Sequence, residues 1–385
     1  MFDILTLNAI SDKIYTVLNS DYSVSSDTKS PDAILVRSFK MDEYEINDNL
    51  LAVARAGAGV NNIPIPKMTE KGICVFNTPG ANANAVKELV ICGMLLSARD
   101  IVGGNAWANT LECDVAKQVE KGKKAFGGTE ISGKTLGIIG LGAIGRKVAV
   151  AAAALGMKIA GYDPFLSPAA AKELPEGTEI VSSPEDIYPL ADYITLHVPL
   201  TDATRQMINA DSVAKMRDGV VILNMARGEL VNVADVKAAI ASKKIRKYVV
   251  DFPTEESVGV DGILAIPHLG ASTEEAEDNC AIMAAAQLKD YLENGNVVNS
   301  VNFPRLVKER EYAERFTLVG NASKDVDKAL ENILDGTAHS VSYAEKGSVC
   351  YAIIDVDADI CAGENSILDK LSDMDDVISV RLLKA

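Results

Sequence analysis

The sequence predicts an α/β protein built on parallel sheets, and three observations support this fold class. Short apolar runs rich in β-branched residues alternate with helical or turn-rich segments from the start of the chain. A glycine-rich turn joins one of these runs directly to an alanine-rich stretch. Several later runs end on polar or charged residues, which would meet at one edge of a parallel sheet because the carboxyl ends of its strands share that edge.

The first part of the chain predicts one sheet followed by a long helix. Strands are expected at 2–7, 33–36, 51–54 and 73–76, and a helix over 86–111 follows, with weak points at Gly93 and at Gly103 and Gly104. A loop at 127–128 precedes the next strand. We place a domain boundary near residue 98.

The glycine-rich turn, residues 140–145, has the features of a dinucleotide-binding unit. It follows the apolar run 136–139 and precedes a predicted helix at 146–155, a strand at 157–162 and then Asp163. Gly140 allows the sharp turn, Gly142 allows a pyrophosphate to approach the backbone, and Gly145 allows close helix packing. Asp163 would accept hydrogen bonds from ribose hydroxyls and repel a 2′-phosphate, which favours NAD over NADP. The alternative is an ordinary glycine-rich turn.

Polar residues after three later strands predict a catalytic set. Strands are expected at 193–196, 220–223, 248–250 and 263–266. Oxidation of a 2-hydroxy acid needs a base of near-neutral pKa, a carboxylate to orient it and a cation for the substrate carboxylate. His268, Glu256 and Arg227 fit these roles. The alternatives are a structural histidine and a surface ion pair.

The order of elements predicts three domains. A helix from a cap at 272–275 through Leu292 would return the chain to the first domain, which would then comprise 1–98 and 278–304, with a nucleotide-binding domain at 99–277. Residues 312–385 predict a ferredoxin-like βαββαβ module, with strands at 316–319, 338–343, 349–356 and 377–383 and helices at 325–334 and 364–371.

Composition excludes several classes of protein. Hydrophobic residues make up 48% of the chain, which is typical of folded domains. A net charge of −16 argues against nucleic acid or an anionic membrane as partner. The six cysteines lack metal-ligand spacing, so we expect reduced thiols and no metal. No signal-peptide pattern or apolar stretch of ~20 residues is found, and a cytoplasmic location is expected.

Six stretches together resemble the D-isomer-specific 2-hydroxyacid dehydrogenase family: 54–62, 75–80, 136–145, 196–200, 224–228 and 267–273. The resemblance implies NAD-linked oxidation of a small anionic acid by two doubly wound domains, Rossmann-like and flavodoxin-like, with a cleft. It implies that Arg227, a glutamate and His268 form the catalytic set. It also implies further cofactor-binding positions, namely Ala143, Ile144, His197, Thr204, Met225, Ala226, Asp251 and Gly270.

The position of the family's glutamate is ambiguous by one residue. Phe252-Pro253 as the anchor selects Glu255, whereas Asp251 with the usual spacing of five selects Glu256. We prefer Glu256 because Arg227 and Asp251 keep the family spacing.

Substrate binding is predicted at the strand ends of the first domain. The backbone N–H groups of 57–59, which are Gly57, Ala58 and Gly59, would bind the substrate carboxylate. Arg37 and Arg55, with Ser38 and Asn77 nearby, favour a phosphorylated acid. The alternatives are arginines that are solvated or paired with local acids, an unphosphorylated substrate such as glyoxylate, hydroxypyruvate or D-lactate, and a non-catalytic, dinucleotide-sensing protein like the corepressors of this fold.

The C-terminal module resembles ACT domains, which pair between subunits and bind serine in related dehydrogenases. The loop at 320–325 lacks the glycine expected there and carries Lys324 and Asp325. A homodimer or homotetramer is therefore expected, and serine as an effector is left open.

Overall fold

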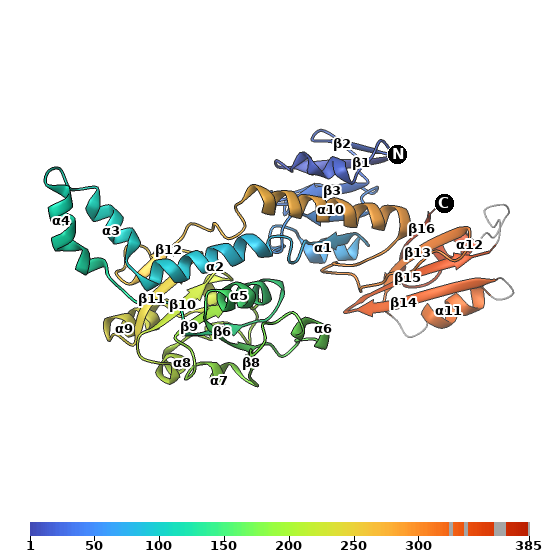
Figure 1. The fold of residues 1–385 in the computed structure, drawn as a ribbon. Helices are drawn as coiled ribbons and strands as arrows, with labels where there is room; N and C mark the ends of the chain where they lie inside the picture. Colours follow the sequence, from blue (N-terminus) through green and yellow to red (C-terminus); the bar gives the residue numbers. More distant parts are fainter. Residues whose placement is uncertain (323–325, 335–337, 358–366, 384–385) are drawn as a thin grey trace. The chain divides into compact units, whose positions relative to one another are not determined.

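The computed structural model describes residues 1–322, 326–334, 338–357 and 367–383 (Figure 1). The chain folds into two compact units: unit 1 comprises Met1–Ala81 and Glu277–Ala385, and unit 2 comprises Asn82–Ala276. The expected boundary near residue 98 differs from this division, because helix α2 (Ala83–Ala98) belongs to unit 2. Its apolar side chains Val90 and Met94 lie in the same core cluster as Leu136.

Unit 1 contains a five-stranded parallel sheet in the order β2-β1-β3-β4-β5. This is a flavodoxin-like order. Helix α10 packs against one face, where Ala281, Ala284 and Leu288 join Ile4 and Leu35 in one core. The elements are β1 (Phe2–Leu7), η1 (Asp12–Thr16), β2 (Tyr22–Ser25), β3 (Ala33–Val36), β4 (Ala52–Arg55), α1 (Ile65–Glu70), β5 (Cys74–Phe76) and α10 (Glu274–Asn294).

Unit 2 contains a seven-stranded parallel sheet in the order β12-β11-β10-β9-β6-β7-β8. This is the Rossmann order with one additional strand. Helices α2 and α5 contribute to the core on one face, and α7, α8 and α9 to the core on the other. The elements are β6 (Thr135–Ile139), α5 (Ala143–Ala154), β7 (Lys158–Tyr162), α6 (Pro168–Ala171), β8 (Glu179–Ile180), α7 (Pro184–Ile187), β9 (Tyr193–Leu196), α8 (Ala210–Lys215), β10 (Val220–Asn224), η3 (Gly228–Leu230), α9 (Val233–Ala241), β11 (Ile245–Val250) and β12 (Ile263–Ala265).

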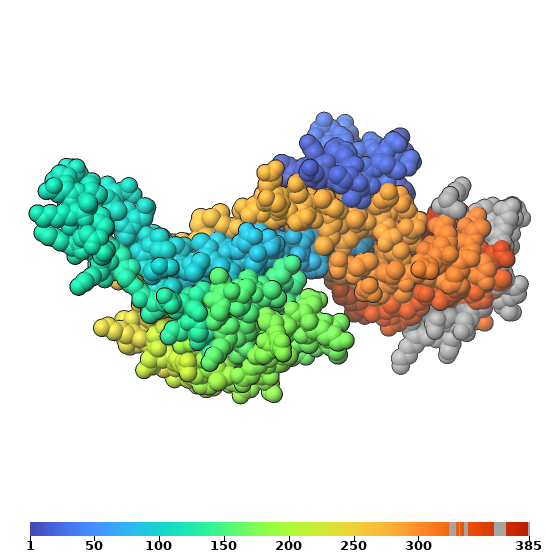
Figure 2. Space-filling model, in the orientation of Figure 1, coloured from blue at the N-terminus to red at the C-terminus, as the bar shows by residue number. Residues whose placement is uncertain are grey.

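A helical arm, residues 100–126, extends from the sheet of unit 2 (Figures 1 and 2). It comprises α3 (Ile101–Ala108), α4 (Val115–Gly122) and η2 (Lys123–Phe126). The single helix predicted over 86–111 was wrong: the chain breaks at 99–100, because Asp100 caps α3 by accepting a hydrogen bond from the Gly103 N–H at 3.2 Å. Neither α3 nor α4 has a buried residue.

The C-terminal residues form a four-stranded antiparallel sheet in the order β14-β15-β13-β16, which is the ferredoxin-like arrangement. One face packs on its own helices. The other face contributes Val319, Tyr351 and Ile353 to the core that contains α10, so the sheet is an integral part of unit 1. The elements are β13 (Glu314–Asn321), α11 (Val326–Ile333), β14 (His339–Lys346), β15 (Val349–Val356), α12 (Ile367–Ser372) and β16 (Val377–Leu383).

Three side chains of this sheet bind the carboxyl end of α10. Arg315 donates to the Asn294 carbonyl at 2.9 Å, Arg381 to the Leu292 carbonyl at 2.9 Å, and Tyr351 to the Gly295 carbonyl at 2.6 Å. The last carbonyls of a helix have no partner within it, and they carry partial negative charge. The C-terminal sheet therefore supplies the cap of this helix. Across the described ranges, no helix has the length and apolar character needed to cross a membrane.

Candidate active site

The glycine-rich turn has the geometry that the sequence predicts. Gly140 has a φ of +99° and donates to the Tyr162 carbonyl at 2.8 Å, and a Cβ at this position would collide with the His197 carbonyl. A Cβ at Gly145 would collide with the Gly140 carbonyl, whereas one at Gly142 would meet open space. Helix α5 begins at Ala143, three residues earlier than predicted, and has no side-chain cap. Its first N–H groups, including those of Ala143 and Ile144, are therefore suited to bind phosphate.

Asp163 follows β7 and supports this turn. Its carboxylate accepts hydrogen bonds from the Leu141 N–H and the Phe165 N–H, both at 2.9 Å. An open glycine position, an uncapped helix and an acid at the end of the second strand fit a dinucleotide. These residues would hold the pyrophosphate and the ribose.

His197 and Thr204 make local hydrogen bonds. The His197 ring lies 2.9 Å from the Thr195 hydroxyl, and burial lowers the pKa of His197 to about 3, so its ring is neutral at physiological pH. The Thr204 hydroxyl donates to the Pro199 carbonyl at 2.6 Å, which stabilises the turn after β9.

Arg227 is positioned by a buried amide at the end of β10. Asn224 is fully buried, and its side chain donates to the Arg227 carbonyl at 2.8 Å and accepts from the Ala226 N–H at 3.1 Å. These bonds fix the short loop that also contains the buried Met225. The Arg227 guanidinium lies 5.7 Å from the centre of the Phe252 ring.

His268 is positioned in the same way by a buried carboxylate at the end of β11. Asp251 is 1% exposed and accepts hydrogen bonds from the Leu269 N–H at 2.7 Å and the Gly270 N–H at 2.8 Å. Burial raises the pKa of Asp251, while both N–H bonds and the nearby His268 oppose that shift. His268 has a φ of +55°, and its ring centre lies 4.5 Å from that of Phe252. Arg227 and His268 therefore lie beside the same aromatic ring.

Neither Glu255 nor Glu256 is placed against His268 as the carboxylate that would orient its ring. Glu255 and Glu256 are both exposed in the turn after Phe252, and within the described residues neither forms a hydrogen bond or ion pair with His268. The turn is held by the buried Ser257, whose hydroxyl accepts from the Thr254 N–H at 2.8 Å. The sequence analysis did not predict that the side chains of Asn224 and Asp251 hold the loops of Arg227 and His268. A polar residue at the end of an apolar strand could have indicated it.

The predicted substrate residues lie at strand ends of unit 1. Arg37 follows β3 and Arg55 ends β4, and Arg55 Nε donates to the Arg37 carbonyl at 3.0 Å. The Arg37 guanidinium forms an ion pair with Glu277 at 2.5 Å, a residue that the sequence reasoning missed. Ser38 is exposed beside Arg37, and its N–H donates to Asn8 at 3.1 Å.

The loop at 57–59 is only partly available to a ligand. Asn77 donates to the Ala58 carbonyl at 2.6 Å and so fixes the loop. The Gly57 N–H donates to the Arg55 carbonyl at 2.9 Å, whereas the N–H groups of Ala58 and Gly59 form no hydrogen bond to any described residue. A Cβ at Gly57 would collide with the Arg55 guanidinium, so this glycine allows the arginine to lie against the loop.

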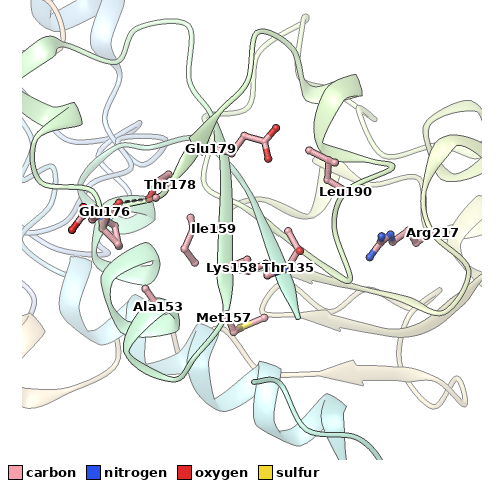
Figure 3. A pocket seen from close by; sticks show the side chains of 12 residues that line it. Thr135, Ala153, Met157, Lys158, Ile159, Glu176, Thr178, Glu179, Leu190 and Arg217 are labelled. Carbon is pink, nitrogen blue, oxygen red and sulfur yellow. Dashed lines mark hydrogen bonds between the residues drawn. The ribbon is translucent and has the colours of Figure 1, made fainter. Parts of the chain in front are cut away.

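A hollow of about 390 Å³ lies at the opposite edge of the sheet of unit 2 (Figure 3). Thr135 and Lys158, which begin β6 and β7, line it together with Arg217. Ligands of doubly wound sheets bind at the carboxyl ends of the strands, so this hollow is not the dinucleotide site.

Comparison with known proteins agrees with this geometry. Residues 91–272 match the model of the D-isomer specific 2-hydroxyacid dehydrogenase NAD binding domain. The hydroxypyruvate reductase of Thermotoga maritima is 41% identical over 263 residues, covering 65% of this chain and 81% of that protein. The chain belongs to the D-isomer-specific 2-hydroxyacid dehydrogenase family. Its cofactor is NAD.

Other family members differ in size and substrate. The D-3-phosphoglycerate dehydrogenase of Methanocaldococcus jannaschii is 36% identical over 335 residues, covering 83% of this chain and 61% of that protein. An NAD⁺-bound 3-phosphoglycerate dehydrogenase of Entamoeba histolytica aligns with a TM-score of 0.61 at 28% identity, covering 78% of this chain and 98% of that one. The chain spans 61% of the length of the Methanocaldococcus jannaschii protein and 50% of the length of the human D-3-phosphoglycerate dehydrogenase.

Proposed function

We propose that this family member oxidises D-3-phosphoglycerate to 3-phosphohydroxypyruvate with NAD, the first step of L-serine biosynthesis. One observation supports dehydrogenase chemistry above all. Arg227 and His268 flank Phe252 at the carboxyl edge of the sheet that carries the glycine-rich turn. Relatives called D-3-phosphoglycerate dehydrogenase, among them the human protein at 36% identity, support the substrate.

Each residue has a definite task in this proposal. His268 accepts the proton of the substrate hydroxyl, and Arg227 binds the substrate carboxylate through two parallel hydrogen bonds. Asp251 and Asn224 hold the two loops in place. Glu256, or Glu255, orients the imidazole and stabilises its charged form. NAD⁺, when bound, would accept the carbinol hydrogen together with its two bonding electrons, as a hydride.

Arg37 and Arg55 bind the phosphate in this proposal, and the N–H groups of Ala58 and Gly59 bind the carboxylate. Guanidinium groups suit phosphate because their donors match its oxygens in pairs. A second candidate function, reduction of hydroxypyruvate, is favoured by the 41% identity to the Thermotoga maritima enzyme and by the pairing of Arg37 with Glu277.

The substrate is tested by initial rates with NAD(H) and NADP(H). D-3-phosphoglycerate is assayed in the oxidative direction, and hydroxypyruvate phosphate, hydroxypyruvate and glyoxylate in the reductive direction. We expect kcat/KM to be highest for hydroxypyruvate phosphate with NADH among the reductive substrates. An R55A variant should lose affinity for hydroxypyruvate phosphate and retain it for hydroxypyruvate. Higher kcat/KM for hydroxypyruvate would support the second candidate.

The base is tested by replacing His268. H268A should lower kcat roughly 10²-fold or more without weakening NADH binding. H339A, which changes a histidine of the C-terminal sheet, is the matched control and should retain activity. Normal turnover by H268A would exclude this residue as the base, and absence of turnover by the wild type with every acid would favour a non-catalytic protein.

We also propose that the protein forms a homodimer or a homotetramer. The helical arm exposes Ile101, Val102 and Val115 at 48%, 52% and 46%, although such side chains are usually buried. Sedimentation of an I101D/V102D variant should show smaller particles than the wild type. Serine as an effector stays a proposal, and part of the loop at 320–325 lies outside the described residues.

A cytoplasmic location is supported by the free thiols of Cys74, Cys92, Cys113, Cys280 and Cys350, which are typical of a reducing compartment.

A further inference from the structure

An ion pair in unit 1 is not explained by the proposed function. Glu277 is the fourth residue of α10, and its carboxylate contacts the guanidinium of Arg37 at 2.5 Å. Both side chains are partly exposed, at 37% for Arg37 and 41% for Glu277. An anion from solvent can therefore reach the same guanidinium.

The backbone of Arg37 is fixed independently of Glu277. Its carbonyl accepts hydrogen bonds from Arg55 Nε at 3.0 Å and from the Asn62 amide at 3.4 Å. Removal of the Glu277 charge would therefore leave Arg37 at the end of β3. What changes is whether a carboxylate of the protein competes for its guanidinium.

We propose that Glu277 is a specificity-determining residue, which competes with the substrate phosphate for Arg37. This inference rests on the proposed function, in which Arg37 binds phosphate. In the free enzyme, Glu277 neutralises Arg37, and a phosphate must replace or repel this carboxylate to bind. An unphosphorylated acid does not use Arg37 and leaves the pair intact. Glu277 thereby weakens the binding of phosphorylated substrates selectively.

The variants E277Q and D278N separate this effect from a general change of charge. The glutamine side chain of the first variant can still accept a hydrogen bond from Arg37 but carries no charge. Asp278 lies on the same helical turn, and its carboxylate accepts from the Ser11 hydroxyl instead of from Arg37. Both variants remove one negative charge from nearly the same place.

KM is measured for hydroxypyruvate phosphate and for hydroxypyruvate at low ionic strength. E277Q should lower KM for hydroxypyruvate phosphate about three- to fivefold, since a partly exposed ion pair is weak. KM for hydroxypyruvate should stay within about twofold, as should both values for D278N. In an R37A background, the E277Q substitution should have no effect. Unchanged KM for hydroxypyruvate phosphate in E277Q, an equal change in D278N, or a change that persists in R37A would overturn the inference.

A second readout distinguishes failure of this inference from failure of the proposed function. Inorganic phosphate is tested as an inhibitor of hydroxypyruvate reduction, and E277Q should lower its inhibition constant. If the wild type prefers hydroxypyruvate but phosphate inhibits E277Q more strongly, the substrate proposal fails and the role of Glu277 stands. If phosphate inhibits both proteins equally, the role of Glu277 is refuted whichever substrate is preferred.

Discussion

The substitution D251N tests whether a buried carboxylate positions the catalytic loop. Asp251 accepts the Leu269 and Gly270 N–H groups with separate oxygens, at 2.7 and 2.8 Å. Asparagine has one oxygen, so one of these N–H groups would face an NH₂ group and lose its acceptor. An unsatisfied buried donor costs about 1–3 kcal/mol. Because burial already raises the pKa of Asp251 and so opposes its charge, we expect a loss near the middle of that range, about 2 kcal/mol.

Two measurements follow from this estimate. For a unit of this size, about 2 kcal/mol lowers the melting temperature by roughly 4–8 °C. The positive φ of His268 depends on its neighbours, so its ring should shift, and a shift of about 1 Å can cost up to roughly 10²-fold in turnover. Thermal unfolding and kcat, measured well below the transition, report the two effects.

The control is D235N, because Asp235 also accepts a backbone N–H, that of Ala210 at 2.9 Å, away from the catalytic loop. D235N keeps one side-chain oxygen for this N–H, so it should leave both the melting temperature and kcat close to the wild-type values. If D251N lowers the melting temperature but turns over like the wild type, the carboxylate supports the fold alone and the positioning argument is refuted.

Three further predictions concern other described contacts. D163S should raise KM for NADH about tenfold or more, because a charged acceptor for the ribose hydroxyls is lost. It should also reduce the ratio of kcat/KM with NADH to kcat/KM with NADPH. If this ratio does not change, Asp163 does not bind the ribose. His197, whose pKa burial lowers from 6.5 to about 3, binds a proton in the unfolded chain before it does in the fold. The neutral His197 therefore gives its full contribution to the free energy of unfolding above pH 6.5. Between pH 6.5 and pH 3 this contribution falls by about 1.4 kcal/mol for each pH unit of acidification. Urea titrations at several pH values should show a smaller pH dependence of stability for H197Q than for the wild type. R381A should lower the free energy of unfolding by about 1–2 kcal/mol, because Arg381 caps α10 and its guanidinium lies 4.9 Å from the centre of the Tyr291 ring. Stability is measured by urea denaturation. An unchanged free energy of unfolding would show that these contacts do not stabilise the fold.

The sequence predicted the sheets well because strand signals are local. Strands at 2–7, 33–36, 349–356 and 377–383 match the observed limits, since alternating or continuous apolar runs end at clear turn residues. The two-residue strand β8 was missed because Glu179 and Ile180 are exposed and belong to no apolar run.

Helix limits were less predictable because caps and tertiary contacts determine them. The break at 99–100 depends on the Asp100 cap. The glycines predicted as weak points do not interrupt a helix: Gly103 lies inside α3, and Gly93 packs against Leu223, Met225 and Val249. Likewise, the contact of Glu277 with Arg37 joins residues 240 positions apart, and no local pattern indicates it.

The capping of α10 limits which modules can replace the C-terminal sheet of this chain. Arg315, Arg381 and Tyr351 belong to the ferredoxin-like sheet, but the carbonyls that they satisfy belong to the preceding helix. A replacement module without equivalent donors would leave those oxygens without partners against an apolar surface formed by Tyr291 and Phe303. Grafting of a foreign tail should therefore succeed only if the graft brings its own cationic and hydroxyl donors, or if α10 is redesigned with it.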